Sequence, residues 1–600
     1  MRLRHGWLVP AFVMMGCWSA WLAAGPQVQR VDDHVLRRAG ASGDDWLTYG
    51  LTQAETRYSP LTDINADNVG RLGLAWSADI GSGGGRQEAT PLVWNGAIYV
   101  ISNYSVVFAI DARTGKERWH WDPQVNPAAV RPELCCGVVN RGLAIYQGMI
   151  MAPVVDGRLE ALDAETGKVV WEARVAFPQE HYTITMAPRI ARGKVIVGVS
   201  GGEFPTRGFF DAYDATTGHR VWRFYTVPGD PAKPFENEAL KKAAQTWDGD
   251  WWKLGGGGAV WDGMAYDPDL DLIYVGTGNA EPWPRQFRGS MGKDNLYVCS
   301  ILAVRAATGE LKWHYQVVPG DIWDYDSVQQ LTLADLTIDG RLRKVIMQAN
   351  KNGFFYVLDR GTGRLISADP YARVTWASGI DLKTGRPIVN PDAYYGTEPI
   401  ALSPGPGGAH NWPPMSFNPT TGLVYVPATT ASSSTFAAQP TYEPQPTRQD
   451  GFTGLVFPPQ RATRPSPPAI GPEPPPGGGR ALIAWDPVAR QIRWRTTGSG
   501  STLTTAGNLV IETLNDGRLL AYSADRGEKL LDIDTGAGSG LGPPITYRVG
   551  GRQYVSLLGG IGRAAALLPG SPFVAADTPP PRLLAFALDA AGTTERVTPH

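Results

Sequence analysis

The chain has 600 residues, of which 43% are hydrophobic and 19% charged, a globular composition that is longer than one ordinary domain. Its net charge of −2 provides no basic surface, so no nucleic-acid partner is expected. Glycine (71), proline (49) and tryptophan (21) are abundant, which predicts many short strands, tight turns and few long helices.

Residues 1–24 have the form of a secretory signal peptide. Arg2 and Arg4 precede an apolar run that ends in small residues. An uncleaved membrane anchor is the alternative, but the run is short, and Pro10 and Gly16 interrupt it. We therefore expect export to an oxidising compartment, and no later segment has the composition of a membrane span.

Two cysteines, Cys135 and Cys136, are adjacent in the sequence. Neighbouring Cα atoms lie about 3.8 Å apart, below the usual disulfide range of roughly 4.4–6.8 Å, so a bond between them strains an eight-membered ring. Two reduced, buried thiols are the ordinary alternative. In an oxidising compartment, with Cys17 removed in the signal, the adjacent pair is the natural disulfide. Cys299 is then an odd thiol, expected to be buried in a strand.

An internal repeat is the strongest signal in the chain. In each copy an alternating strand ends, a turn that is Thr-Gly in the clearest copies reverses the chain, and the next strand brings a large apolar residue, usually Trp. Tryptophan is large enough to fill the space between two sheets. Clear copies span 109–119, 161–171, 212–222 and 303–313, weaker copies span 357–366, 484–494 and 521–531, and Leu74-Ala75-Trp76 ends another.

These eight copies predict an all-β fold, an eight-bladed β-propeller with tryptophan-docking repeats. Their spacing of about fifty residues suits one four-stranded sheet and a loop per repeat. We expect a single propeller domain over residues 25–600. Residues 223–260 form an insertion with a possible short helix over 236–244. Residues 432–480 are rich in Pro, Gly and Ser and are expected to form an extended or mobile surface loop.

Taken together, the repeat, the adjacent cysteines and a set of spaced polar motifs resemble the quinoprotein alcohol dehydrogenases. These are periplasmic eight-bladed propellers that carry pyrroloquinoline quinone (PQQ) and a metal ion. The resemblance covers nearly the whole mature chain, from Asp45-Trp46 to about residue 560. Singly, each polar residue is more typical of a surface or a turn, so only the joint match carries the expectation. It implies PQQ as the cofactor and the periplasm as the location.

The resemblance also implies which residues contact PQQ, a flat quinone with three carboxylates. The disulfide of Cys135 and Cys136 would lie against one face, and Trp261 would cover the other, although Trp261 could instead be one more tryptophan between blades. Arg141 matches a guanidinium that pairs with a carboxylate. Lys351 matches a cation near the quinone oxygens. The other implied contacts are Glu88, Thr185, Ser200, Gly201, Gly202, Asn411 and Trp412.

The implied metal ligands are Glu203, Asn279, Asp324 and Asp326. Carboxylate and amide oxygens suit a hard cation and not zinc. Asp324 matches the catalytic base that accepts the alcohol proton. Lanthanide-dependent members carry an aspartate at the position of Asp326, where calcium-dependent members carry a small or uncharged residue. We therefore expect a lanthanide ion, with Ca²⁺ as the alternative. The ordinary alternative for Asp326 is a turn cap or a solvent-facing residue.

Two positions depart from the family pattern. Ile561 stands where members commonly carry a Trp near the cofactor, which implies a lost aromatic contact or added substrate space. Gly137 stands where a polar residue often follows the cysteines. Neither change removes an implied metal ligand or the base.

The implied reaction is oxidation of a small alcohol to an aldehyde, with electrons passed singly to a separate, soluble cytochrome c. The sequence has no Cys-x-x-Cys-His motif for a covalent haem, unlike fused quinohaemoproteins. A non-catalytic propeller scaffold is the alternative class, but it has no need for this combination of acids, lysine and cysteines. The oligomeric state stays open, with a homodimer among the options.

Overall fold

The structure is a computed structural model that describes residues 1, 30–445, 452–456, 459–476, 478–562 and 580–590. Apart from Met1, the predicted signal over residues 1–24 lies outside these ranges. Within them, no helix is both long and apolar enough to cross a bilayer.

Eight sheets contain most of the strands of the described chain. Taken from the buried first strand to the more exposed fourth, the first four are β3 (Leu92–Trp94), β4 (Ala97–Ile101), β5 (Val107–Asp111) and β6 (Glu117–Trp121); β7 (Ala144–Tyr146), β8 (Met149–Pro153), β9 (Arg158–Asp163) and β10 (Val169–Arg174); β11 (Arg189–Ala191), β12 (Lys194–Gly198), β13 (Phe209–Asp214) and β14 (Arg220–Tyr225); and β15 (Met264–Asp267), β16 (Leu272–Gly276), β17 (Ser300–Arg305) and β18 (Leu311–Gln316). The other four are β19 (Thr332–Ile338), β20 (Arg341–Ala349), β21 (Phe354–Asp359) and β22 (Leu365–Pro370); β26 (Ser416–Asn418), β27 (Leu423–Thr429), β29 (Arg480–Asp486) and β30 (Gln491–Thr497); β31 (Ser501–Thr505), β32 (Leu509–Thr513), β33 (Arg518–Ser523) and β34 (Lys529–Asp534); and β35 (Ile545–Val549), β36 (Arg552–Gly559), β37 (Arg582–Leu588) and β2 (Leu72–Asp79).

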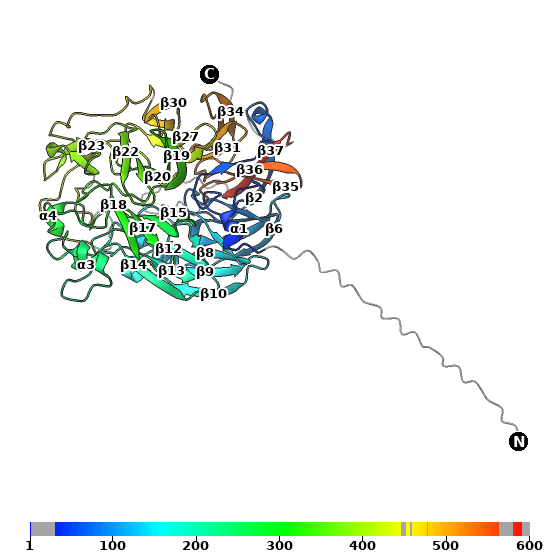
Figure 1. The fold of residues 1–600 in the computed structure, drawn as a ribbon, viewed down its shortest axis with the longest axis horizontal. Coiled ribbons are helices and arrows are strands. Elements are labelled where there is room, and N and C mark those ends of the chain that lie inside the picture. Colours follow the sequence, from blue (N-terminus) through cyan, green and yellow to red (C-terminus); the bar gives the residue numbers. More distant parts are fainter. Residues whose placement is uncertain (2–29, 446–451, 457–458, 477, 563–579, 591–600) are drawn as a thin grey trace.

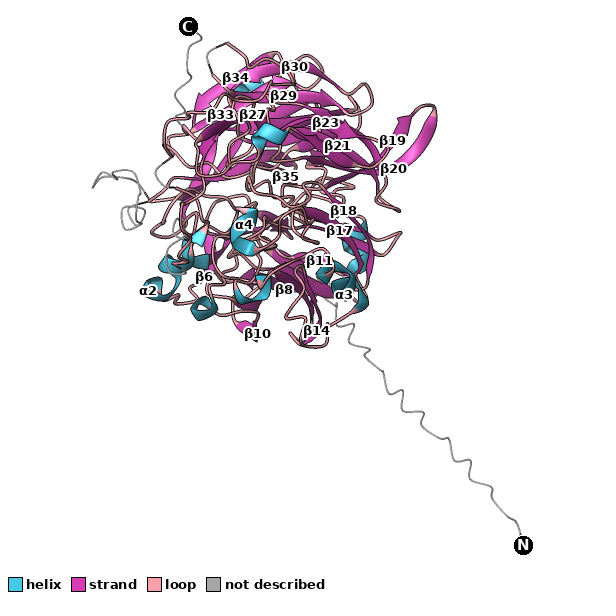
Figure 2. Ribbon diagram, turned by 90° about the vertical axis from the view of Figure 1, so that its left-hand side faces the viewer, coloured by secondary structure: helices cyan, strands magenta, loops and turns pink. Residues whose placement is uncertain are grey.

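These sheets are the blades of a ring, which confirms the predicted eight-bladed β-propeller (Figure 1). In that view the blades follow one another around the centre in chain order, from β10 at the bottom through β18 at the left to β30 at the top. The side view in Figure 2 shows that helices are few and short among the described residues. They are α1 (Asp33–Arg37), α2 (Pro127–Val130), α3 (Glu238–Ala244) and α4 (Arg285–Arg288).

The ring is closed by β2, which precedes the first blade in the sequence. It pairs with β37 as the outer strand of the last blade, with a register from Leu72–Leu588 to Asp79–Arg582. Another early segment, β1 (Tyr58–Ser59), pairs in parallel with β31 on the channel side of its blade. β1 and β2 thereby tie residues 58–79 to the last two blades of the ring.

The tryptophans of the repeat dock on the next blade, as predicted. Trp119 Nε1 donates to the carbonyl oxygen of Ala164 at 3.1 Å, and a Cβ on Gly167 would lie 2.6 Å from the indole ring. The same close approach joins Trp171 to Gly218. Both glycines have φ values near +70°, at +70° and +72°, so one residue serves the turn and the docking of an indole.

The insertion after β14 contains the predicted short helix, with a later start. α3 begins at Glu238, whereas the prediction began at residue 236. Asn237 is the N-cap, and its side chain accepts the backbone N–H of Leu240 at 3.0 Å, which fixes the beginning of the helix.

The segment 432–480 makes contacts that its composition does not suggest. β28 (Ser434–Phe436) pairs with β25 (Ile400–Leu402), and the side chains of Phe452 and Leu455 are buried. These apolar residues are isolated in a Pro-rich stretch and follow no periodicity, so a pattern-based prediction misses them. A further two-stranded sheet nearby in sequence joins β23 (Ala377–Asp381) to β24 (Arg386–Val389).

Candidate active site

The predicted site residues converge at one end of the channel. First strands of the blades begin there and second strands end there, because consecutive strands are antiparallel. Loops before first strands carry Glu88 (before β3), Cys135, Cys136 and Arg141 (before β7), Thr185 (before β11), Trp261 (before β15), Asp324 and Asp326 (before β19), and Asn411 and Trp412 (before β26). Loops after second strands carry Ser200, Gly201, Gly202 and Glu203 (after β12), Asn279 (after β16) and Lys351 (after β20).

Arg141 joins several of the predicted cofactor contacts in a buried network. Its Nη1 donates to Thr185 Oγ1 at 2.8 Å, and its Nη2 lies 2.8 Å from Glu88 Oε2. Thr185 Oγ1 is hydrogen-bonded to Ser200 Oγ at 2.7 Å. The Arg141 guanidinium also lies over the Trp261 ring, 4.9 Å from its centroid. Residues predicted separately are thus side by side in the folded chain.

Lys351 and the two predicted aspartates form a buried ion-paired group. Lys351 Nζ donates to Asp324 Oδ2 at 2.8 Å and to Asp326 Oδ2 at 2.7 Å. Burial raises the pKa of Asp324 well above its ordinary value; Lys351 opposes this shift, and the charge of Asp326 adds to it. Asp324 also has φ +65°, a backbone conformation that is rare outside glycine and concentrates at functional sites. Asp326 is only 2% exposed, so it does not face solvent.

Glu203 and Asn279 lie beside this group. Asp326 Oδ1 accepts the backbone N–H of Asn279 at 2.7 Å. Burial and the charge of Asp326 raise the pKa of Glu203 to about 7. A Cβ on Gly202 would lie 3.0 Å from Asn279 Oδ1, so the amide oxygen is placed against the backbone that leads into Glu203.

The glycine run 255–258 supports the Asn279 segment. All four glycines have φ between +76° and +86°, which other residues rarely adopt. Gly258 N–H donates to the carbonyl oxygen of Asn279 at 2.8 Å, and a Cβ on Gly257 would collide with that oxygen. The close approach of this run to the Asn279 backbone therefore gives a physical reason for the glycines, besides their place before Trp261.

Two buried acids at this end were not predicted. Asp262 lies 3.5 Å from Arg141 Nε through its Oδ2. Glu281 accepts hydrogen bonds from Asn279 Nδ2 at 3.0 Å and from Trp283 Nε1 at 2.7 Å. The only sequence signal for Glu281 was an acid between a predicted ligand and a Pro-Trp pair.

Cys135 and Cys136 form the predicted disulfide, with Cα atoms 3.8 Å apart, and both lie on an exposed loop. Gly137 has φ +93°, a backbone conformation that favours glycine, which explains why a glycine stands where family members often carry a polar residue.

Cys299 is free and buried, as expected, although it lies one residue before β17 and not within the strand.

The remaining predicted positions lie on the side of the site formed by Arg86. Trp412 is partly buried, and its ring centroid lies 5.2 Å from the Arg86 guanidinium. Asn411 Nδ2 donates to the carbonyl oxygen of Gly407 at 3.0 Å. The backbone of Ile561 is hydrogen-bonded to the loop before β3, because its carbonyl oxygen accepts the N–H of Gly84 at 3.1 Å.

We call Glu203, Glu281, Asp324, Asp326 and Lys351 the acid cluster. With Asn279 it supplies the oxygen donors that a hard cation prefers. Among the described residues, however, no three Asp, Glu, His or Cys side chains converge as a metal centre requires. The Lys351 ammonium lies between the two aspartates and takes an oxygen of each. The predicted ligands are therefore gathered without forming a coordination shell, and their role as ligands stays a prediction.

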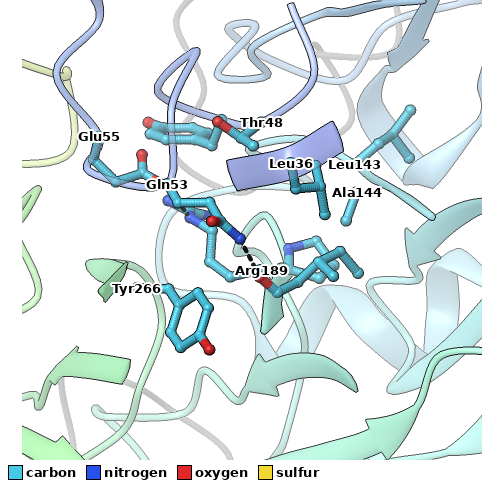
Figure 3. A pocket seen from close by; sticks show the side chains of 11 residues that line it. Leu36, Thr48, Gln53, Glu55, Leu143, Ala144, Arg189 and Tyr266 are labelled. Carbon is cyan, nitrogen blue, oxygen red and sulfur yellow. Dashed lines mark hydrogen bonds and ion pairs between the residues drawn. The ribbon is translucent and has the colours of Figure 1, made fainter. Parts of the chain in front are cut away.

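A second buried charge group lies deeper along the channel, and we call Glu55, Arg57 and Arg189 the arginine cluster. Arg189 Nε donates to Glu55 Oε1 at 2.7 Å. Figure 3 shows the cavity beside this pair, lined also by Gln53 and Tyr266. Its volume of about 20 Å³ has room for about one water molecule and not for an alcohol.

The comparisons with known proteins agree with this geometry. Residues 46–368 match the PQQ family described as "Glucose/ethanol/alcohol dehydrogenase, beta-propeller domain". Quinohemoprotein alcohol dehydrogenase ADH IIB of Pseudomonas putida is 48% identical over 582 residues, which cover 95% of this chain and 80% of that protein. The 1-butanol dehydrogenase (cytochrome c) of Thauera butanivorans is 42% identical over 535 residues, which cover 87% of this chain and 75% of that protein.

Two solved structures extend the match to three dimensions. The quinohemoprotein alcohol dehydrogenase from Comamonas testosteroni superposes with a TM-score of 0.84 at 45% identity, covering 95% of this chain and 84% of that one. A europium-containing methanol dehydrogenase superposes with a TM-score of 0.80 at 33% identity, covering 93% of this chain and 100% of that one. Fold and site together define a propeller oxidoreductase. The chain belongs to the PQQ-dependent alcohol dehydrogenase family, as its motifs predicted.

Proposed function

We propose that the protein oxidises an alcohol to the aldehyde at the acid cluster, with PQQ as cofactor. The observation that carries the proposal is the placement of Asp324, which is buried beside Lys351 and Asp326 at the end of the channel where the predicted cofactor contacts converge. The chemistry is RCH2OH → RCHO + 2 H⁺ + 2 e⁻. Bound PQQ would supply the acceptor for the two electrons.

The residues of the chain divide the remaining work. Arg141, with Glu88 and Thr185, would hold the polar rim of the cofactor, and Trp261 and the disulfide would cover its faces. Asp324 accepts the proton of the alcohol hydroxyl. Lys351 keeps that carboxylate in place through a contact of 2.8 Å.

We infer that the metal ion is a lanthanide, with Ca²⁺ as the alternative. Glu203, Asn279, Asp324 and Asp326 would hold it. Asp326 supports the choice, because a buried extra carboxylate favours a trivalent ion over a divalent one. The europium-containing methanol dehydrogenase, at 33% identity, supports it further.

Electrons then leave singly to a separate cytochrome c in the periplasm. The cytochrome c named for the Thauera relative supports such an acceptor. The predicted signal over residues 1–24 supports the location. A homodimer remains a prediction.

The test compares wild-type protein with Asp324→Asn after loading with PQQ and either La³⁺ or Ca²⁺. Absorbance reports bound quinone, and a dye-linked assay reports alcohol oxidation. We expect both proteins to bind PQQ, and Asp324→Asn to turn over about 10²–10⁴-fold more slowly because it lacks the base. Failure to bind PQQ with either metal, or full activity of Asp324→Asn, would contradict the proposal.

A further inference from the structure

Glu281 is a fully buried acid, 0% exposed, that has no role in the predicted ligand set. Its Oε1 accepts hydrogen bonds from Asn279 Nδ2 and Trp283 Nε1. Its Oε2 is also buried and has no hydrogen-bond partner in the described part of the chain. A carboxylate oxygen in that state is costly unless another charge compensates it.

The contact with Glu281 decides which way the Asn279 amide points. Since Nδ2 donates to Glu281, Oδ1 points the other way, to within 3.0 Å of where a Cβ on Gly202 would lie. Gly202 leads directly into Glu203, and the Asn279 N–H donates to Asp326. The amide oxygen is therefore turned toward the side of the site where the predicted carboxylate ligands lie.

Glu281 is itself held in position. Trp283 Nε1 donates to Oε1 at 2.7 Å, and the Glu281 backbone N–H donates to the carbonyl oxygen of Gly256 at 3.2 Å. Burial raises the pKa of Glu281 well above its ordinary value, and the negative charges of Glu203 and Asp324 add to the shift. Glu281 is therefore close enough to the other acids of the cluster to interact with them electrostatically.

We propose that Glu281 is a positioning residue that sets the metal preference of the site. It holds Asn279 with Oδ1 toward the ion, and it adds a fourth carboxylate to Glu203, Asp324 and Asp326, which favours a trivalent cation over a divalent one. Coulomb attraction scales with the charge of the ion, so each added carboxylate gains more from a trivalent ion. The inference rests on the proposed function only in that a cation binds at the acid cluster.

The test is direct metal binding to the metal-free, full-length protein. Terbium luminescence excited through tryptophan reports Tb³⁺ binding, and Ca²⁺ is added as the competitor. Glu281→Gln preserves the size of the side chain and removes its charge. We expect it to weaken Tb³⁺ binding about 10–100-fold, the usual effect of losing a group that orients a ligand, and to weaken Ca²⁺ binding less. Trp283→Phe removes only the indole donor, so a smaller loss is expected for both ions.

Glu512→Gln is the matched control. Glu512 is also 0% exposed with an unpartnered Oε2, but it lies on β32 in another blade. This variant should bind both ions as the wild type does. Glu281→Gln with wild-type affinity for both ions would overturn the inference, and an equal loss for both ions would overturn the selectivity that it assigns. A wild-type protein that binds neither ion would remove the metal site of the proposed function itself, an outcome distinct from both.

Discussion

The two buried charge groups along the channel differ in how their charges are satisfied. In the arginine cluster, Arg189 pairs with Glu55 at 2.7 Å, and Arg57 donates to three backbone carbonyl oxygens at 2.6–2.9 Å. The acid cluster has four carboxylates and one ammonium, that of Lys351, which pairs with only two of them, Asp324 and Asp326.

This difference separates a structural group from a binding group. The guanidiniums of the arginine cluster find their acceptors within the protein, so they connect distant segments and need no ligand. Burial raises the pKa of one glutamate in each group to about 7, Glu55 in the arginine cluster and Glu203 in the acid cluster, so the pKa does not separate them. The acid cluster differs in having more carboxylates than cations, and a carboxylate without a cation is costly to bury as a charge. An added cation would offset that cost, which is why we propose the metal site at the acid cluster and not at the arginine cluster.

The largest expected effect comes from removing one cation of each group. Arg189→Met leaves Glu55 without its partner, and Lys351→Met leaves the two aspartates without theirs. Breaking a buried pair costs about 3–5 kcal/mol, which denaturant unfolding measures. We expect La³⁺ to restore stability to Lys351→Met, by about 4 kcal/mol at 1,000 times its Kd, and to leave Arg189→Met unstable. Restoration of both variants, or of neither, would erase the distinction between the groups.

A smaller effect is expected from Asp326→Ser, which removes one carboxylate and leaves the base in place. The variant should lose about 10–100-fold of its La³⁺ affinity while its Ca²⁺ affinity changes less. The measurement is the concentration of each ion that gives half-maximal alcohol oxidation in PQQ-loaded protein. An unchanged ratio of the two concentrations would count against a lanthanide role for Asp326.

The smallest effect concerns Glu512, a buried acid without any cationic partner among the described residues. Burial raises its pKa to about 8 from an ordinary 4.5, so the folded state holds this proton more tightly than the unfolded state. Stability therefore falls as the pH rises from 4.5 to 8. Glu512→Gln cannot ionise, and we expect it to be more stable than wild type by at least about 1 kcal/mol at pH 8 but not at pH 4. Parallel stability profiles of the two proteins would contradict this.

The propeller could be predicted because its signal is local and repeated. Each Thr-Gly turn and the Trp after it recur along the chain, and the structure shows why, since Gly167 admits the Trp119 ring of the preceding blade. The α3 boundary was displaced because a cap, Asn237, decided it. The apolar anchors at Phe452 and Leu455 follow no period and were not foreseen.

The site was predictable only where a motif identified its residues. Glu88, Arg141 and Thr185 lie in one network, but nothing in their spacing showed that Arg141 would contact both of the others. Arg57 was missed because its acceptors, Thr502 and Pro544, are 445 and 487 residues away. Glu281 was missed because its importance lies in an oxygen that has no partner, which a sequence cannot show.

The most direct test of a cation site at the acid cluster is a crystal structure of the protein with PQQ and La³⁺, in which anomalous scattering locates the ion. We expect one strong anomalous peak for lanthanum in contact with Glu203, Asn279, Asp324 and Asp326. The Lys351 ammonium should no longer lie between the two aspartates. A structure with PQQ bound, Lys351 still bridging Asp324 and Asp326, and no lanthanum peak beside them would contradict it.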